Sequence, residues 1–225
     1  MAGKLIECVP NFSEGRRQDV IEAIVAPFRA TKGCGLLDYR ADADHNRLVV
    51  SLAGSPEPVQ EALLKAAAVA VQKIDMNSHQ GAHPRIGAVD VIPFTPVSNI
   101  SMEECVALSH SFGERYWKEL GVPVYFYEDS AKRPERKRLE VIRKGQYETL
   151  KTESVTPERA PDVGGPALHP TAGATVMGAR KFLVAFNVNL NTADEEIAKK
   201  IANCVRASSG GFCHVKGMGV ALHER

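Results

Sequence analysis

The stretch RLVVSLAGSPEPVQEALLKAAAVAVQKI, residues 47–74, contains two kinds of hydrophobic periodicity in direct succession. Residues 47–53 are a short apolar run that favours a β-strand. Residues 57–74 repeat apolar and alanine positions at helical spacing, and the prolines of SPEP suit a first helical turn. The stretch therefore predicts a strand, a short connection and an amphipathic helix.

The same alternation of strands and helices continues on both sides of this stretch. Ser101 is followed three residues later by Glu104, as in a capping box, and Gly121 ends the helix that begins there. Short connections between such elements favour an α+β fold, a ferredoxin-like sandwich whose mixed sheet is covered by helices. The expected strands are Lys4–Val9, Gly35–Asp38, Arg47–Ala53, Val89–Phe94 and Val122–Tyr127, and the expected helices are Gln18–Phe28, Glu57–Ile74 and Ser101–Leu120.

The C-terminal part of the chain predicts a second, smaller module. A strand over Phe182–Leu190, a helix from about Ala193 to Ala207 and a closing strand over Val215–Leu222 would form one β-α-β unit. A sheet of this size is too small to be well covered alone. We therefore expect an incomplete β-α-β module that another chain completes, for example a second copy in a homodimer.

Composition favours a soluble, cytoplasmic protein with a small partner. The 225 residues carry 28 basic and 27 acidic side chains, so no net field attracts nucleic acid or an anionic membrane. The first residues lack the apolar core of a secretory signal, and no apolar run is long enough to span a bilayer. The five cysteines form no C-x-x-C pair, so neither a disulfide framework nor a zinc knuckle is indicated.

The stretch NSHQGAHPRIGAVDVIPFTP, residues 77–96, carries the strongest indication of chemistry. Pro84 biases His83 toward extended backbone, so the imidazole is presented from a loop that leads into a strand. Such a histidine can transfer protons near neutral pH, and the alternative is a histidine whose nitrogens bond to loop carbonyls. His79 and His83 have the spacing of helical metal ligands, but Gly81 and Pro84 oppose a helix, so no metal is expected.

Two further segments have two interpretations each. GGPALHPTAGATVMGAR, residues 164–180, either brings backbone amides close to a ligand or acts as a flexible linker. If it contacts a ligand, Gly173→Val should block binding without unfolding the protein. AKRPERKRLEVIR, residues 131–143, is the densest basic run, and it either attracts an anionic substrate tail or forms a solvated helix face.

Four motifs together resemble the glutamate formiminotransferase family. They are VPNFSEG at 9–15, HNR at 45–47, IDMNSHQGAHPRIGAVDVIPFTPV at 74–97 and GPALHPTAGATVMGARKFLVAFNVNLN at 165–191. They occur in the family's order, and the likeness extends over essentially the whole chain. The resemblance implies transfer of a formimino group between N-formiminoglutamate and N5 of tetrahydrofolate, as part of histidine degradation and one-carbon metabolism.

The resemblance also implies where the substrates bind. Folate is implied to lie in a channel between two subdomains, which correspond here to residues 1–176 and 177–225, and His83 is implied to act in proton transfer. Tetrahydrofolate is thus the expected co-substrate. The implied folate-contacting residues are Gly164, Gly165, Pro166, Ala167, Leu168, His169, Pro170, Thr171, Ala172 and Gly173.

The chemistry of such a transfer suggests roles for other polar side chains. The attacking nitrogen must lose a proton and the departing nitrogen must gain one, and a neutral His83 can do both. Asp38 is the first candidate to stabilise the cationic donor, and Asp42 is the second. Arg47 and Arg85 could hold glutamate carboxylates, and Arg85 could equally be a structural arginine that ties the loop to carbonyl groups.

Two other functions remain open on the sequence. The resemblance implies a catalytic domain that continues beyond residue 225, so the chain could be a catalytically weak folate-binding fragment. It could also be half of a split enzyme that needs a complementary C-terminal chain. A related folate activity, formyltetrahydrofolate cyclisation, would require a nucleotide.

Overall fold

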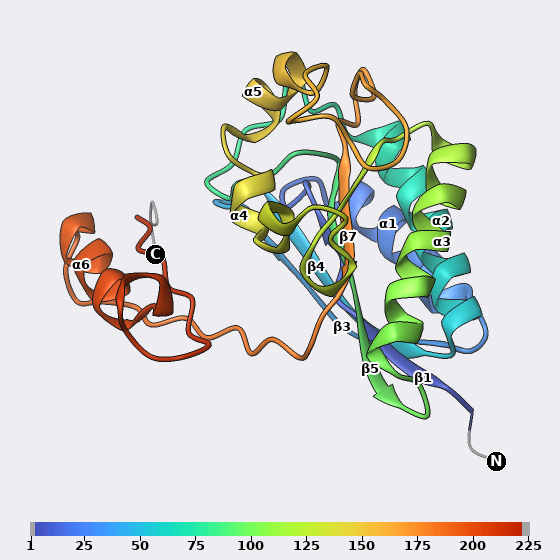
Figure 1. Cartoon of the computed structure of the whole chain (residues 1–225), viewed down its shortest axis with the longest axis horizontal. Helices are drawn as coiled ribbons and strands as arrows, with labels where there is room; N and C mark the ends of the chain where they lie inside the picture. The colour runs from blue at the N-terminus through green and yellow to red at the C-terminus, as the bar shows by residue number, and fades with distance from the viewer. Residues whose placement is uncertain (1–2, 222–225) are drawn as a thin grey trace. The chain divides into compact units, whose positions relative to one another are not determined.

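A computed structural model of the chain describes residues 3–221 (Figure 1). The chain divides into two compact units, one up to Phe182 and one from Leu183 onward. No helix among residues 3–221 is long and apolar enough to cross a membrane.

The first unit is built on a seven-stranded mixed sheet. Strands β1 and β2 occupy one place in the sheet in succession, since both pair with β4 on one side and with β5 on the other. On the far side of β5, strand β7 lies parallel to both β5 and β6. The strands are β1 (Leu5–Cys8), β2 (Asn11–Phe12), β3 (Cys34–Asp42), β4 (Arg47–Gly54), β5 (Val89–Ser98), β6 (Val124–Phe126) and β7 (Thr175–Ala179).

The order of elements up to β5 is that of a ferredoxin-like fold. Strand β1, helix α1 (Gln18–Ala30), strands β3 and β4, helix α2 (Pro56–Lys73) and strand β5 follow one another along the chain. In the sheet, β1 lies between β5 and β4, and β3 forms the edge beyond β4. Two strand-helix-strand units thus interleave in one antiparallel sheet, and the predicted α+β class is confirmed.

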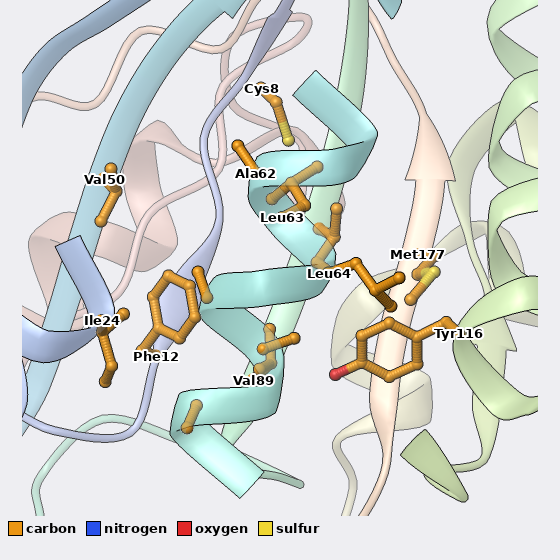
Figure 2. Close-up of a cluster of buried hydrophobic side chains, with 14 of the residues drawn as sticks. Cys8, Phe12, Ile24, Val50, Ala62, Leu63, Leu64, Val89, Tyr116 and Met177 are labelled. Carbon is orange, nitrogen blue, oxygen red and sulfur yellow. The ribbon is translucent and has the colours of Figure 1, made fainter. Parts of the chain in front are cut away.

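The helices α1, α2 and α3 (Met102–Leu120) lie along one face of this sheet (Figure 1). The alternation of side chains along β4 shows which face of the sheet is buried. Leu48, Val50 and Leu52 are buried on the side of the helices, and the residues between them are half-buried. Figure 2 shows Leu64 of α2 in the same core as Tyr116 of α3. Complete burial of such a side chain contributes ~1.5–3 kcal/mol, so this core is a main source of stability.

The predicted capping box of α3 is confirmed. The backbone N–H of Glu104 donates to Ser101 Oγ at 3.2 Å, and the N–H of Ser101 donates to Glu104 Oε2 at 2.8 Å. At the other end Gly121 adopts a left-handed conformation with φ of 65°, and its N–H donates to the carbonyl of Trp117. This conformation suits glycine, so the helix ends there.

The opposite face of the sheet is covered only in part. Over β5, β7 and β6 it carries a second core, to which the short helices α4 (Leu139–Ile142) and α5 (Gln146–Glu153) contribute Ile142 and Leu150. Over β3 and β4 the same face is half exposed, and it carries Arg47 opposite Asp42. The open part of this face borders the loop that contains His83.

The last strand of the sheet lies earlier than predicted. Residues Thr175–Ala179 form β7, which is buried between β5 and β6, whereas the expected strand over Phe182–Leu190 is wrong. A strand is stable only where a neighbour satisfies its backbone groups, and β7 has two. Residues 182–190 have no strand partner among the described residues, and Val184 is 89% exposed.

Only the helix of the predicted C-terminal module is present in the second unit. Helix α6 (Glu195–Val205) falls within the expected range, and Asp194 caps it by accepting a hydrogen bond from the N–H of Glu196 at 2.9 Å. The expected closing strand is absent over residues 215–221, and Leu222 lies outside the described residues. Both expected strands of this module lack a neighbouring strand in the described chain, which explains why neither forms.

The basic run at residues 131–143 is not a single solvated helix face, because Lys132, Lys137 and Arg138 are exposed whereas Arg136 is buried. It contains a 3₁₀ turn, Pro134–Lys137, and the short helix α4. Arg136 is buried and forms an ion pair with buried Asp162, with 2.8 Å between Nη1 and Oδ1. Arg133 donates to the carbonyl of Pro157 at 2.8 Å. These two arginines therefore attach the basic run to the segment 157–162.

Candidate active site

The loop between α2 and β5 carries His83 and is held by the motif segments around it. Ser13 of the VPNFSEG motif donates through its backbone N–H to Ala88 O at 2.9 Å and through Oγ to Gly87 O at 2.7 Å. The N–H of Ala82 donates to Asp44 O at 3.0 Å, so the turn between β3 and β4 packs on the loop. Gly81 lies directly against the carbonyl of His45, where no side chain would fit, so this close approach of the loop to the turn requires a glycine.

The structure brings the His83 loop and the glycine-rich segment together. The N–H of Met76 donates to Thr171 O and that of Ala88 to Ala172 O, each at 2.8 Å. Asn77 adds a side-chain hydrogen bond from Nδ2 to the carbonyl of Pro170 at 2.9 Å. Segments some 90 residues apart in sequence, such as Asn77 and Pro170, are thus held side by side by several hydrogen bonds.

His83 is held in its neutral form. Burial is the largest cause that lowers its pKa, and the positive charges of Arg47 and Arg143 and the neighbouring His45 and Arg85 lower it further, to about 2. The rings of His45 and His83 are 6.4 Å apart between centroids. A neutral imidazole has one nitrogen free to accept a proton, but with so low a pKa it accepts one only weakly while the surrounding positive charges are uncompensated.

Asp42 is the carboxylate associated with this histidine pair. Its Oδ1 accepts hydrogen bonds from the N–H groups of Asp44 at 3.0 Å and His45 at 2.9 Å, and it lies 3.0 Å from His45 Nδ1. These contacts order the HNR motif as a tight turn at the end of β3. Asp42 thereby orients His45, which in turn faces His83.

Asp38 lies away from this cluster. It pairs across the sheet with Ser51, whereas Asp42 pairs with Arg47, so the two carboxylates are four residues apart, roughly 13 Å along the strand. The Asp38 side chain is 56% exposed and bonds to Arg40 Nε at 3.0 Å. The structure therefore does not bring Asp38 to His83, because Asp38 lies four residues before the end of β3, where the turn with His45 begins.

Arg47 is close to His83 and has unused hydrogen-bonding capacity. It begins β4, and its Nε is buried without a hydrogen-bond partner among residues 3–221. Burial and the charge of Arg143 lower its pKa, while Asp42 and Asp90 oppose that change. A buried guanidinium with an unpartnered N–H is a candidate to bind an anion.

Arg85 is engaged entirely within the protein. Its Nε donates to His79 Nδ1 at 3.2 Å, and Nη2 donates to the carbonyl of His79 at 3.0 Å and to Glu148 Oε1 at 2.6 Å. Its Nη1 donates to Gln146 Oε1 at 3.0 Å and to Glu148 Oε2 at 2.8 Å. A guanidinium has five N–H donors, and these contacts use all of them. The contacts favour the structural alternative for Arg85, which ties the loop to α5.

Asp90 and Arg143 are two residues of the site that the sequence reasoning missed. Asp90 is 2% exposed, accepts a hydrogen bond from the N–H of Ile86 at 2.8 Å and forms an ion pair with Arg143. The sequence does indicate that Asp90 is unusual, because it is a lone carboxylate within the apolar run VDVIPF. A buried charge of this kind needs a partner. The identity of that partner, 53 residues away, could not be read from spacing.

The glycine-rich segment has an exposed part and a buried part. Residues 164–167 are exposed, and the backbone N–H groups of Gly164, Gly165 and Ala167 make no hydrogen bond with another described residue. In the buried part, His169 Nδ1 accepts from the N–H groups of Thr171 and Ala172, so the His-Pro pair orders a turn. The segment can therefore offer amide donors to a ligand while its other end is fixed.

Two of its glycines are required by the protein itself. Gly173 has a φ of 70°, and a Cβ there would collide with the carbonyl oxygen of Ile86. Gly164 has a φ of 75°, and a Cβ there would collide with the Trp117 ring. Close packing of the chain on itself therefore accounts for these two glycines, and the expectation that Gly173→Val leaves the fold intact is not supported.

No group of three or more His, Cys, Asp or Glu side chains within residues 3–221 is arranged to hold a metal ion. A cavity of about 220 Å³ lies next to the loop, and its lining includes Glu14, Arg17, Lys73 and His79. Neither His83 nor the glycine-rich segment lines it. Pockets for ligands of drug size usually measure roughly 300–1,000 Å³, so this cavity is too small for a folate.

Comparison with known proteins now adds to the geometry. Residues 5–180 match the model of the formiminotransferase domain, N-terminal subdomain. The chain belongs to the formiminotransferase family. It is 49% identical over 222 residues to a glutamate formimidoyltransferase of Streptococcus pyogenes, covering 99% of this chain and 74% of the relative. It is 43% identical to the glutamate formimidoyltransferase of Thermoplasma acidophilum over 98% of this chain and 73% of the relative.

Longer members of the formiminotransferase family match over the same region. The chain is 49% identical to the formimidoyltransferase-cyclodeaminase of Gallus gallus, covering 98% of this chain and 42% of the relative. The chain thus spans less than half of that protein and about three quarters of the two microbial relatives. Because these relatives are named as formimidoyltransferases, the chemical class is that of a transferase, and tetrahydrofolate is the co-substrate that this activity implies.

Proposed function

We propose that this protein transfers a formimino group between N-formiminoglutamate and N5 of tetrahydrofolate, with His83 in general acid-base catalysis. The observation that carries the proposal is the neutral imidazole of His83 in a loop that is hydrogen-bonded to the glycine-rich segment. The names of the relatives support the same reaction. In a cell this reaction would belong to histidine degradation and one-carbon metabolism in the cytoplasm.

The reaction needs a group that moves one proton twice. N5 of tetrahydrofolate attacks the formimino carbon, so a C–N bond forms and a tetrahedral intermediate results. His83 accepts the N5 proton and then donates it to the glutamate nitrogen as the second C–N bond breaks. General acid-base catalysis of this kind is worth typically about a hundred- to ten-thousandfold, and the remaining acceleration would come from holding both substrates in register.

The other proposed roles follow from the contacts around His83. Asp42 is preferred over Asp38 as the carboxylate that stabilises the cationic donor, because Asp42 contacts His45 beside the proposed base. Arg47 is the proposed carboxylate ligand, whereas the donors of Arg85 are already used. Residues 164–173 are proposed to contact folate, and residues 1–176 and 177–225 are the proposed subdomains.

A second candidate function is folate binding without efficient turnover, by a chain that needs a partner. The observation that favours it is the exposure of apolar side chains from residue 182 onward, such as Phe186 at 82% and Phe212 at 69%. Large exposed apolar side chains in a row are typical of a surface that another polypeptide covers. A second copy of this chain or a complementary C-terminal chain would then complete the active enzyme.

The assay of formimino transfer from N-formiminoglutamate to tetrahydrofolate distinguishes these functions. We expect transfer by the purified chain, and we expect His83→Ala to lower kcat at least about a hundredfold while folate affinity stays within about twofold. Replacing the exposed His214 by alanine serves as the matched control and should leave kcat unchanged. Background transfer by the wild type, identical to that of His83→Ala, would refute the enzyme and favour the binding fragment.

A further inference from the structure

Two arginines from distant parts of the chain converge on His83. Arg47 begins β4 and Arg143 follows α4, and the charges of both act on the imidazole, as do His45 from the β3–β4 turn and Arg85 from the same loop. The two guanidinium groups also repel each other, since the charge of Arg143 acts on Arg47. Several positive charges held close together and shielded from water favour the binding of an anion.

Both arginines keep unused donors for such an anion. The Nε atoms of Arg47 and Arg143 are buried, and neither has a hydrogen-bond partner among residues 3–221. Of the two nearby carboxylates, Asp90 bonds to the N–H of Ile86 and to Nη2 of Arg143, and Asp42 Oδ1 accepts two backbone N–H groups within its turn, so neither bonds to the two unpartnered Nε atoms. Asp90 therefore fixes Arg143 next to the loop without using its Nε.

We propose that Arg47 and Arg143 together bind the α-carboxylate of the formimino donor beside His83. This inference rests on the proposed function. In N-formiminoglutamate the α-carboxylate is attached to the carbon that carries the departing nitrogen, so a carboxylate held here brings that nitrogen to the imidazole. The glutamate part of tetrahydrofolate is separated from N5 by the aminobenzoyl group, so its carboxylates cannot lie here while N5 reacts.

The bound carboxylate would also prepare His83 for its task. Without an anion, a proton on the imidazole is opposed by Arg47, Arg143 and Arg85, and with the donor present the carboxylate offsets part of that positive charge. The imidazole can then accept the N5 proton as the N5–C bond forms. It returns the proton to the glutamate nitrogen as that C–N bond breaks, which releases L-glutamate and 5-formiminotetrahydrofolate. Arg47 and Arg143 are thus positioning and charge-balancing residues for this step.

Isothermal titration of the full chain with L-glutamate tests the subsite without requiring turnover. Arg47→Gln is the cleanest variant, because Arg47 Nε has no hydrogen-bond partner among residues 3–221 and no ion pair of the Arg47 guanidinium is found there. We expect it to weaken L-glutamate binding by about ten- to a hundredfold, the usual worth of charge-assisted hydrogen bonds. Arg143→Lys should weaken binding while it keeps a charge opposite Asp90.

Two measurements complete the experiment. Lys144→Gln removes the same charge from an exposed neighbour and should leave L-glutamate affinity unchanged. In a nuclear magnetic resonance titration of the wild type, saturation with L-glutamate should raise the pKa of His83 by at least one unit. Folic acid and pteroic acid serve as further probes, since only the former carries a glutamate, and their affinity ratio should be the same in Arg47→Gln as in the wild type.

Each outcome supports or overturns the subsite. Equal L-glutamate affinity in wild type and Arg47→Gln, or no binding to the wild type, would overturn it. A loss of folic acid binding with unchanged pteroic acid binding would assign the arginines to the folate tail instead, and would overturn it as well. If L-glutamate binding depends on Arg47 but no formimino transfer occurs, the subsite stands and the proposed function alone fails.

Discussion

Gly87 and Gly173 face each other as partners in an antiparallel bridge. Gly87 belongs to the loop of His83 and Gly173 to the glycine-rich segment, so this bridge joins the two stretches that carry the proposed chemistry. Neither position has room for a side chain, since a Cβ on Gly87 would meet the carbonyl of Ala174 and one on Gly173 that of Ile86. The spacing between the proposed base and the proposed folate segment is therefore set by backbone contact.

Gly173→Val should destabilise the protein rather than only block folate. Valine at a φ of 70° is strained, and its Cβ would push the bridge apart. We expect a loss of at least about 2–4 kcal/mol in the free energy of unfolding, measured by urea titration. Gly121→Val is the matched control, because its φ is 65° but nothing lies within 4 Å of the new Cβ. Equal losses in both variants would show that strain alone, without collision, determines the effect.

Arg85→Gln should act on stability before it acts on substrate binding. The change removes the ion pair to Glu148, whose side chain is 60% exposed, and leaves the carbonyl of His79 without its donor. We expect a loss of about 2–3 kcal/mol, below the ~3–5 kcal/mol typical of a pair with both partners buried. Arg138→Gln, at a residue whose side chain is 61% exposed, should change stability by less than about 0.5 kcal/mol.

Kinetics separate this structural role from a role in catalysis. In the fraction of Arg85→Gln that remains folded, KM for N-formiminoglutamate should rise less than it does in Arg47→Gln. A variant with wild-type stability and a strongly raised KM would instead restore Arg85 as a substrate ligand.

The low pKa of His83 gives the folded state a defined acid sensitivity. The pKa is about 2 in the folded state against an ordinary value near 6.5, so below pH 6.5 the unfolded chain binds a proton that the folded chain does not. The free energy of unfolding should therefore fall as pH falls from about 6.5 toward 2. His83→Gln removes this contribution, so its stability should decline less between pH 7 and pH 4.5 than that of the wild type. Parallel declines in urea titrations at both pH values would contradict the assigned environment.

Limited proteolysis should cut the chain just after β7. Lys181 is exposed at the start of the extended stretch, and Val184 and Phe186 that follow are 89% and 82% exposed. Trypsin should therefore release a fragment that ends at Lys181 and contains the whole sheet. Thermal unfolding of that fragment should match the main transition of the intact chain within about 2 °C, because no strand of the sheet lies within residues 180–221. Faster cleavage inside residues 5–179 would contradict this division.

Local periodicity predicted helices α1, α2, α3 and α6 and most strands, because each is decided by its own residues, whereas the short helices α4 and α5 were not expected. The capping box of Ser101 and the alternation in β4 are examples. The position of β7 was not predictable in this way, since VMGA and FLVAF are both apolar and only the sheet decides which one finds two neighbours. The loop position of His83 was predictable, but the sequence does not reveal which carboxylate of β3 lies opposite Arg47, so it could not favour Asp42 over Asp38 as the proposed partner of the site.

The position of β7 between β5 and β6 affects how the chain can fold during its synthesis on the ribosome. Strands β5 and β6 flank β7 but begin 86 and 51 residues before it in the chain, from Val89 and Val124 to Thr175. Until Thr175–Ala179 has left the exit tunnel, the nascent polypeptide has two unsatisfied strand edges and an unfilled gap between them. Unpaired strand edges can pair with other chains, so a translational pause after β6 and before residue 175 should promote aggregation.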